Sequence, residues 1–155
     1  DQDVQLRRSG KLDPVRQRCL HDYVPLYLNP RNPMLFSLRD HAESLVVLGL
    51  DPSVLDYHPV HLFADGNAAS DLTEFSLDPS VLLPSLPALQ AKYWNDVPDG
   101  KRRRCAEVLV APSIAPGFVE VAICSNAATA SVVSNSGLNL DGRLFVDSDF
   151  FFQRG

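Results

Sequence analysis

The sequence lacks the features that mark several common classes of protein. Its three cysteines are an odd number without a C-x-x-C spacing, which argues against a disulfide framework and a structural zinc site. The four histidines show no metal-ligand spacing, so we expect no metal. No stretch approaches the roughly 18 apolar residues of a membrane span, and no charged-then-apolar leader opens the sequence. We therefore expect no membrane association, no secretion and a reducing, cytoplasmic setting.

Motifs for common phosphate and acyl chemistry are also missing. There is no Gly-rich phosphate loop and no nucleophile elbow around a serine. What remains is an ordinary globular composition, with 45% hydrophobic and 21% charged residues in a chain of 155. A chain of this length most often forms one domain, so we expect a single domain over residues 1–155.

Charge is unevenly distributed along the chain. For the chain as a whole, the net charge of −5 disfavours a nucleic-acid partner. However, four basic residues are consecutive at 101–104, and five more crowd the first eighteen positions. These two segments could hold phosphates locally, or they could be no more than solvated charges. The pattern alone leaves both interpretations open.

Short apolar runs between turns predict the secondary structure. The runs that predict strands are 22–28, 44–50, 58–63, 105–110, 118–124 and 143–152. Pro25 lies within the first of them, which indicates an edge strand or a bulge. Short strands interleaved with modest helices predict an α+β (mixed α/β) fold.

Helices are predicted in the remaining segments. The helical segments are a start at 34–38, a second start after Asp51-Pro52, a stretch at 78–94 and a short helix at 127–133. Pro84 and Pro87 divide the stretch at 78–94, of which 88–94 is predicted to be the better-formed part. Residues 1–20 show no clear period and predict a mobile or loop-like amino-terminal segment.

Individual polar and aromatic residues have ordinary structural explanations when each is considered alone. Glu107 follows the basic run and begins a predicted strand, where a carboxylate is usually a surface ion-pair partner. Asn67 lies in a Gly-Asn turn that it suits by geometry. Arg31 stands between two prolines and is expected to face solvent, while Tyr27 is expected to pack in or near the core.

Four segments in the same order resemble the DarT family, toxins that ADP-ribosylate DNA bases. The first and most specific is HDYVPLYLNPRNPMLF at 21–36. FADGNA at 63–68 resembles the family's central turn, and AKYW at 91–94 followed by KRRRCAEVLV at 101–110 resembles its catalytic strand. FVDSDFFF at 145–152 resembles its carboxyl-terminal aromatic strand. This similarity extends over nearly the whole chain.

The resemblance implies an ADP-ribosyltransferase fold, a split mixed β-sheet with peripheral short helices and NAD bound in its cleft. It implies NAD as co-substrate without a metal, single-stranded DNA as the acceptor, and a macrodomain antitoxin as partner. Family members normally begin with a strand whose His-containing motif contacts NAD. This sequence reaches its basic stretch almost at once, so we expect a fragment, a strand supplied by another chain, or weakened NAD binding.

The resemblance also assigns roles to individual residues. Glu107 matches the catalytic glutamate, and Arg8 matches an arginine at the reacting centre better than Arg7 does. Arg7, Tyr27 and Asn67 match positions that contact NAD, although Asn67 stands where some members have histidine. The positions that match DNA contacts are Arg31, Met34, Lys101 and Arg102.

These residue types suit the implied reaction. Breaking the bond between nicotinamide and ribose develops positive charge on the sugar, which a nearby carboxylate stabilises. The same carboxylate can accept a proton from the attacking base. The alternatives are transfer to RNA or protein by the same fold, and an inactive module that binds single-stranded nucleic acid.

Overall fold

The computed structural model describes residues 8–152, which divide into two compact units interleaved in sequence. The described part of the first unit contains residues 8–29 and 58–114, and that of the second contains 30–57 and 115–152. Each unit has its own sheet flanked by short helices, so the predicted α+β class with a split sheet is confirmed. The prediction of one domain over residues 1–155 stays a prediction.

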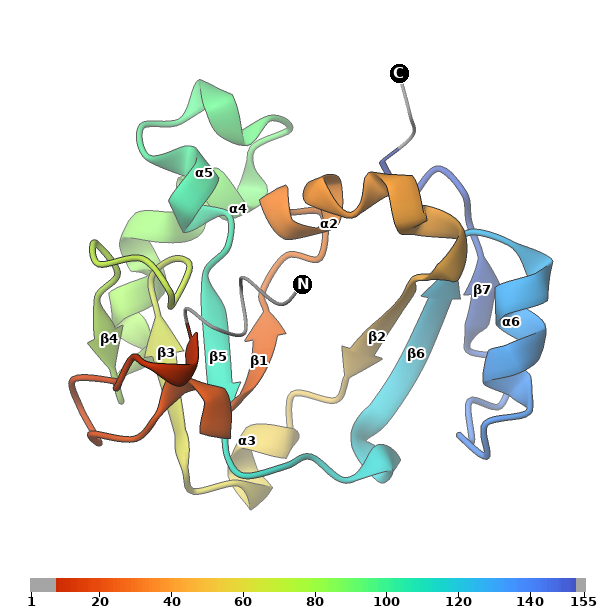
Figure 1. Cartoon of the computed structure of the whole chain (residues 1–155), viewed down its shortest axis with the longest axis horizontal. Helices are drawn as coiled ribbons and strands as arrows, with labels where there is room; N and C mark the ends of the chain where they lie inside the picture. Colours follow the sequence, from red (N-terminus) through yellow and green to blue (C-terminus); the bar gives the residue numbers. More distant parts are fainter. Residues whose placement is uncertain (1–7, 153–155) are drawn as a thin grey trace. The chain divides into compact units, whose positions relative to one another are not determined.

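The first unit is built on a four-stranded sheet in the order β1-β5-β3-β4. Its strands are β1 (Val24–Tyr27), β5 (Glu107–Val110), β3 (His61–Ala64) and β4 (Phe75–Ser76), each antiparallel to its neighbours. Figure 1 shows β5 between β1 and β3, and all four residues of β5 are buried. Pro25 lies in β1 at the edge of this sheet, as predicted, where a missing N–H breaks no ladder on the outer side.

Short helices complete the first unit. They are η1 (Leu20–Asp22), η3 (Pro79–Ser85), α4 (Leu86–Gln90), η4 (Trp94–Asp96) and α5 (Gly100–Arg103). The predicted helix at 78–94 does break, and Asp78 caps its first piece by accepting the N–H of Ser80. The prediction that 88–94 is the better-formed part is wrong. The chain is already extended at Ala91 and forms only a 3-10 turn from Trp94.

A buried arginine joins two of these helices. The Arg104 side chain follows α5, and its Nη1 donates to the carbonyl oxygens of Ala88, Leu89 and Ala91, at 2.8, 3.1 and 2.8 Å. These carbonyls lie at the end of α4, where helical carbonyls have no partners within the helix and attract cations. Arg104 therefore closes the carboxyl end of α4.

Replacing Arg104 with methionine should lower the free energy of unfolding by about 3 kcal/mol. The change keeps much of the apolar stem but removes a charged donor from three carbonyls in a buried setting. Urea unfolding followed by circular dichroism measures the loss. The matched control is Lys101→Met at an exposed position of α5, which should change stability by less than about 0.5 kcal/mol. Equal effects of the two changes would contradict this role of Arg104.

The second unit is built on a three-stranded sheet in the order β2-β6-β7. β2 (Val46–Leu50) is antiparallel to β6 (Val119–Cys124), and β6 is parallel to β7 (Leu144–Val146). The predicted strand at 143–152 ends early at Val146. The carboxylate of Asp147 accepts the N–H groups of Asp149 and Phe150 and turns the chain away from the sheet.

Two of the five helices in the described part of the second unit begin at side-chain caps. Its helices are α2 (Pro33–Ser37), η2 (Arg39–Ser44), α3 (Val54–Tyr57), η5 (Pro116–Phe118) and α6 (Ala127–Ser134). Asn32 caps α2 and Asn126 caps α6 by accepting backbone N–H groups of the first turn. Buried residues of α6 pack with those of β6, and Figure 1 shows α6 beside the sheet. No helix between residues 8 and 152 is long and apolar enough to cross a bilayer.

Candidate active site

Glu107 is completely buried at the first position of β5. Its Oε1 accepts the backbone N–H of Ala68 at 2.7 Å, and its Oε2 lies 3.3 Å from Nη1 of Arg8. Glu107 is therefore not the surface ion-pair partner that its sequence context suggests. A carboxylate without exposed surface is unusual unless it is paired, and here an arginine and a backbone donor provide the pairing.

Arg8 is the cationic partner of this carboxylate. The residue is 6% exposed, and its contact to Glu107 spans 99 positions of sequence. Its second terminal nitrogen, Nη2, is buried and has no hydrogen-bond partner within residues 8–152. A guanidinium presents its donors in a planar fork that suits two oxygen atoms. Nη2 of Arg8 can therefore donate a hydrogen bond to an oxygen atom of a ligand.

The loop that follows Arg8 is organised by a second buried carboxylate. Asp13 accepts the backbone N–H groups of Val15, Arg16 and Arg18 and the hydroxyl of Tyr23. Burial and this hydrogen bond to Asp13 raise the pKa of Tyr23 to about 12, so its hydroxyl remains a donor. These contacts fix the loop over residues 13–23.

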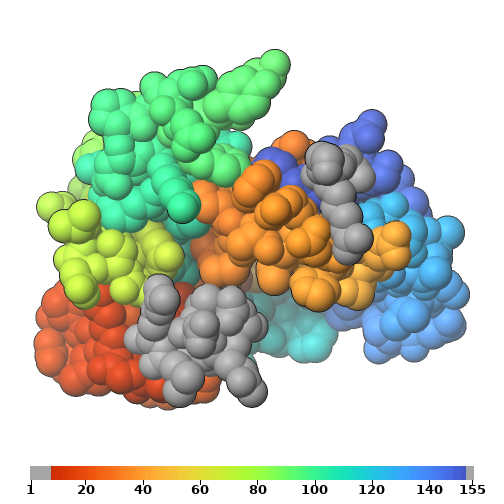
Figure 2. Space-filling model, turned by 45° about the horizontal axis from the view of Figure 1, so that its top comes forward, coloured from red at the N-terminus to blue at the C-terminus, as the bar shows by residue number. Residues whose placement is uncertain are grey.

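A lysine ties the same segment to the loop after β3. Nζ of Lys11 donates to the carbonyl oxygen of Ser70 at 2.8 Å and to Oδ1 of Asp71 at 2.9 Å. Figure 2 shows the amino-terminal segment, coloured red, beside the yellow-green loop that contains these residues. The contacts of Lys11 and Asp13 therefore hold the segment next to Arg8 in place. The predicted mobility of residues 1–20 stays a prediction.

Burial sets the electrostatics of the pair. Loss of solvent raises the pKa of Glu107 above its ordinary value, although the charge of Arg8 and the N–H of Ala68 act to lower it. Tyr27 stands opposite Glu107 in the register of β1 and β5. Burial raises the pKa of Tyr27 well above its usual range, and the charges of Glu107 and Cys105 add to this. Glu107 is therefore a stronger base than a solvated glutamate, and Tyr27 keeps its proton.

Asn67 precedes the Ala68 N–H in the turn after β3. Its side-chain oxygen accepts the N–H of Ala69 at 2.9 Å, and its own N–H donates to the carbonyl oxygen of Arg102 at 3.2 Å. The turn role expected from its sequence is thus present. Its predicted contact to NAD stays a prediction, while its backbone helps to place the donor of Glu107.

The basic run at 101–104 does not form one exposed patch. Lys101 is exposed, whereas the Arg102 side chain is only 10% exposed and pairs with Asp65 and Asp99. Arg103 also reaches Asp65, at 3.3 Å. Of the two predicted DNA contacts in this run, Lys101 presents its charge to solvent and Arg102 has its charge compensated within the protein.

The other predicted DNA contacts, Arg31 and Met34, belong to the second unit. Nη1 of Arg31 donates to the carbonyl oxygens of Asp149 and Phe150, and its guanidinium lies 4.7 Å from the ring centre of Phe152. Met34 is half-buried in the first turn of α2, where its N–H donates to Asn32. Arg7, which was predicted to contact NAD, lies outside the described residues.

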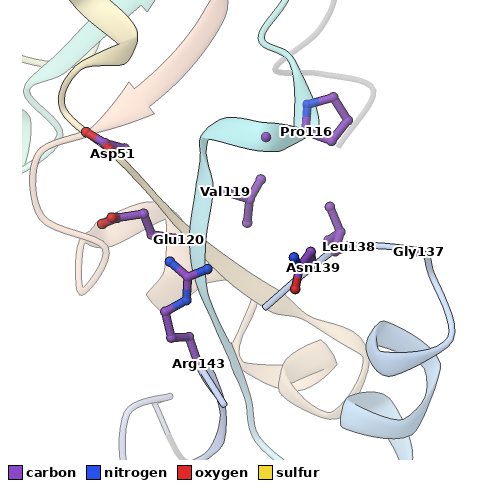
Figure 3. A pocket seen from close by; sticks show the side chains of 9 residues that line it. Asp51, Pro116, Val119, Glu120, Gly137, Leu138, Asn139 and Arg143 are labelled. Atoms are coloured by element: carbon purple, nitrogen blue, oxygen red, sulfur yellow. The ribbon is translucent and has the colours of Figure 1, made fainter. Parts of the chain in front are cut away.

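A cavity of about 410 Å³ lies within the second unit. Figure 3 shows its polar lining, which includes Asp51, Glu120 and Arg143. None of the predicted site residues lines it. Among residues 8–152 no cluster of His, Cys, Asp or Glu side chains could hold a metal ion. The candidate site is therefore the pair of Glu107 and Arg8 in the first unit.

Sequence reasoning missed the backbone donor of this site. Ala68 carries no chemical side chain, and nothing in the sequence marks its N–H as a partner of Glu107. Asp65 was recognised only as part of a turn, although it is buried and holds two arginines. The pairing of an acidic turn with the basic run at 101–104 was the signal that could have indicated it.

The fold is that of solved DarT proteins. One structure, Thermus sp. 2.9 DarT in complex with ADP-ribosylated ssDNA, is similar with a TM-score of 0.82 and 22% identity, over 97% of this chain and 79% of that one. A second, Thermus sp. 2.9 DarT in complex with NAD+, gives a TM-score of 0.72 and 21% identity over 98% and 93% of the two chains. The chain belongs to the DarT family, whose model, described as ssDNA thymidine ADP-ribosyltransferase, matches residues 1–152.

Two relatives have longer chains. A DNA ADP-ribosyl transferase of Thermus sp. (strain 2.9) is 32% identical over 117 residues, which cover 69% of this chain and 56% of the relative. A DNA ADP-ribosyl transferase–DNA ADP-ribosyl glycohydrolase fusion protein of Thermosipho africanus is 26% identical over 157 residues, 98% of this chain and 40% of the relative. The chain thus spans about half the length of these relatives.

Proposed function

We propose that this chain transfers ADP-ribose from NAD to a base of single-stranded DNA and releases nicotinamide. The observation that carries the proposal is the completely buried carboxylate of Glu107, paired with Arg8 and held by the Ala68 N–H. Membership of the DarT family supports DNA as the acceptor and thymidine as the modified nucleoside. The solved DarT complexes with NAD+ and with ADP-ribosylated ssDNA support both substrates.

In the proposed reaction one bond breaks and one forms at the anomeric carbon of the ribose next to nicotinamide. The carbon–nitrogen bond to nicotinamide breaks, and its electron pair leaves with nicotinamide. A ring nitrogen of the thymine base forms the new bond, and its proton passes to Glu107. The carboxylate also stabilises the positive charge that develops on the sugar. The raised pKa of Glu107 suits it to accept the proton.

The remaining residues bind and orient the substrates in this proposal. The buried Nη2 of Arg8 donates to an oxygen of the reacting centre, either a phosphate of NAD or a carbonyl of the base. Tyr27, beside Glu107 in the sheet, contacts the nicotinamide side, and Arg7 and Asn67 contribute to NAD binding. Lys101, Arg31 and Met34 contact the DNA, whose unpaired bases are accessible without duplex opening.

We infer further that the chain acts as a toxin in the cytoplasm. We also infer that a macrodomain partner opposes it by removing ADP-ribose from DNA. The Thermosipho africanus relative, in which a transferase is fused to a DNA ADP-ribosyl glycohydrolase, supports such a partner. Cys19, Cys105 and Cys124, all among the described residues, form no disulfide, which is consistent with a reducing compartment.

Mass spectrometry of oligonucleotides tests the proposed function. The chain is incubated with NAD and single-stranded DNA oligonucleotides that contain or lack thymidine, and in parallel with RNA and protein pools. We expect an added ADP-ribose mass only on thymidine-containing DNA, together with stoichiometric nicotinamide release. Labelling of RNA or protein instead would replace the proposed acceptor. Salt-dependent binding of DNA without nicotinamide release would indicate an inactive binding module and overturn the proposal.

The pH dependence of transfer should report the ionisation of Glu107. Its pKa is raised, so the carboxylate needed as base begins to be lost at a higher pH than for a solvated glutamate. We expect kcat/KM to fall as the pH decreases through this raised pKa, with tenfold loss per pH unit on the acid limb. Steady-state kinetics between about pH 3.5 and 9 measure it. An acid limb at or below the ordinary glutamate range, near 4.3, would contradict the burial argument.

A further inference from the structure

The turn that supplies the Ala68 N–H is clamped by α5. The carboxylate of Asp65 accepts two parallel hydrogen bonds from Arg102, with Oδ1 2.7 Å from Nη1 and Oδ2 3.1 Å from Nη2. Asp65 is 2% exposed, so this is a buried bidentate pair. Such pairs fix geometry as well as contributing energy. We call Asp65 and Arg102 the turn clamp.

Backbone contacts connect the turn clamp to the donor. The carbonyl oxygen of Arg102 accepts the N–H of Asn67, the residue before Ala68, at 3.2 Å. Nη1 of Arg102 also donates to Oγ1 of Thr73 at 3.3 Å, and this hydroxyl donates to the carbonyl oxygen of Asn67 at 2.6 Å. Both peptide groups of Asn67 are therefore held by Arg102, one directly and one through Thr73.

Gly66 allows Arg102 to approach the turn this closely. A Cβ atom at this position would lie 2.5 Å from Nη1 of Arg102 and 2.9 Å from its Cγ. The guanidinium would have to move for any larger residue to fit. The absence of a side chain at Gly66 is thus a requirement of the clamp.

We propose that Asp65 and Arg102 are positioning residues for transfer: the clamp fixes the 65–68 turn so that the Ala68 N–H meets Oε1 of Glu107. Burial acts to raise the pKa of Asp65, but the hydrogen bonds and charges of Arg102, with the N–H of Glu74 and the charge of Arg103, outweigh it and lower the pKa. The clamp therefore stays ionised at neutral pH. The DNA contact predicted for Arg102 stays a prediction, and the charge of this residue is already compensated by Asp65 and Asp99.

Asp65→Asn tests the clamp because the change can shift the pKa of Glu107 in two ways, which have opposite signs. Loss of a nearby negative charge alone would lower the pKa of Glu107. A loosened turn would weaken the Ala68 hydrogen bond and raise it. Among residues 8–152, the charged or titratable groups shown to interact with Glu107 are Arg8 and Tyr27, and neither of them is changed.

Two readouts follow the variant. The ¹³C chemical shift of the Glu107 carboxyl carbon, titrated by NMR, gives its pKa without any need for activity, and we expect an upward shift of about one unit. Because the role also rests on the proposed function, kcat for transfer should fall about tenfold while KM for NAD changes less than about twofold. The exposed Asp141→Asn change in the second unit is the matched control and should leave both unchanged.

Gly66→Ala and Arg102→Lys provide independent variants. Each keeps Asp65, yet each prevents the bidentate contact, so both should raise the pKa of Glu107 as Asp65→Asn does. They carry the test if Asp65→Asn does not fold. An unchanged or lowered pKa of Glu107 in the folded variants would overturn the clamp. Absence of transfer by the unmodified chain would instead reject the proposed function and leave the NMR titration to decide the clamp.

Discussion

Replacing Glu107 with glutamine should abolish ADP-ribose transfer, with kcat falling on the order of 10⁴-fold. Glutamine has nearly the same shape, and its side-chain oxygen can still accept the Ala68 N–H. It cannot accept a proton from the attacking base or stabilise the positive charge on the sugar. Loss of a general base accounts for roughly 10²–10⁴-fold and loss of a preorganised charge for a further 10²–10³-fold, although the two effects are not additive.

The measurement should separate chemistry from binding. Nicotinamide release and the added mass on DNA report the chemical step, and calorimetry reports the dissociation constant of NAD, which should change less than about fivefold. Glu120→Gln is the matched control, because Glu120 is exposed on β6 in the second unit and should keep full activity. Retention of more than about a tenth of the activity by Glu107→Gln would show that another group acts as the base.

The longer strands of both units were predictable from local sequence, whereas the short strand β4 and the ends of some elements were not. Short apolar runs marked each longer strand, and Pro25 marked β1 as an edge or bulged strand, because these signals depend only on neighbouring residues. The early end of β7 depends on where the Asp147 carboxylate points. The helix expected at 88–94 fails because Arg104 captures the last carbonyls of α4 from a distance in sequence.

Glu107 shows why the candidate site could not be derived from residue patterns alone. Whether a carboxylate at the start of a strand is buried depends on its neighbours in the sheet and on Arg8, 99 positions away. The surface ion pair was therefore the reasonable interpretation of the residue alone, and only the family resemblance predicted a catalytic role for it. The structure shows why such a buried carboxylate is tolerated: it accepts hydrogen bonds from the Arg8 guanidinium and the Ala68 N–H.

The basic run shows what linear charge density leaves open. Consecutive positive charges suggest a single surface for phosphates, but a short helix directs successive side chains to different sides. Within α5 and its end, Lys101 faces solvent, Arg102 and Arg103 pair with Asp65, and Arg104 is buried against α4. Linear charge density therefore overestimates the exposed positive surface, because the acidic partners of Arg102 and Arg103 include Asp65, which is distant in sequence.

Replacing Arg8 with lysine should lower kcat/KM about 30-fold, and replacing it with methionine on the order of 10³-fold. Lysine keeps a positive charge near Glu107 but loses the planar fork, including the buried Nη2 that has no partner within residues 8–152. A charged hydrogen bond to a substrate oxygen contributes about 2 kcal/mol, which corresponds to roughly 30-fold. Methionine removes the charge as well.

The acid limb of the pH profile should distinguish the two changes at Arg8. The charge of Arg8 lowers the pKa of Glu107, so Arg8→Met should move the acid limb to higher pH, while Arg8→Lys should leave it nearly in place. Arg143→Lys, at an exposed position of the second unit, controls for the substitution itself and should retain full activity. If Arg8→Lys kept nearly full activity while Arg8→Met lost it and moved the acid limb to higher pH, the contribution of Arg8 would be its charge alone. The assignment of Nη2 to a substrate oxygen would then be wrong.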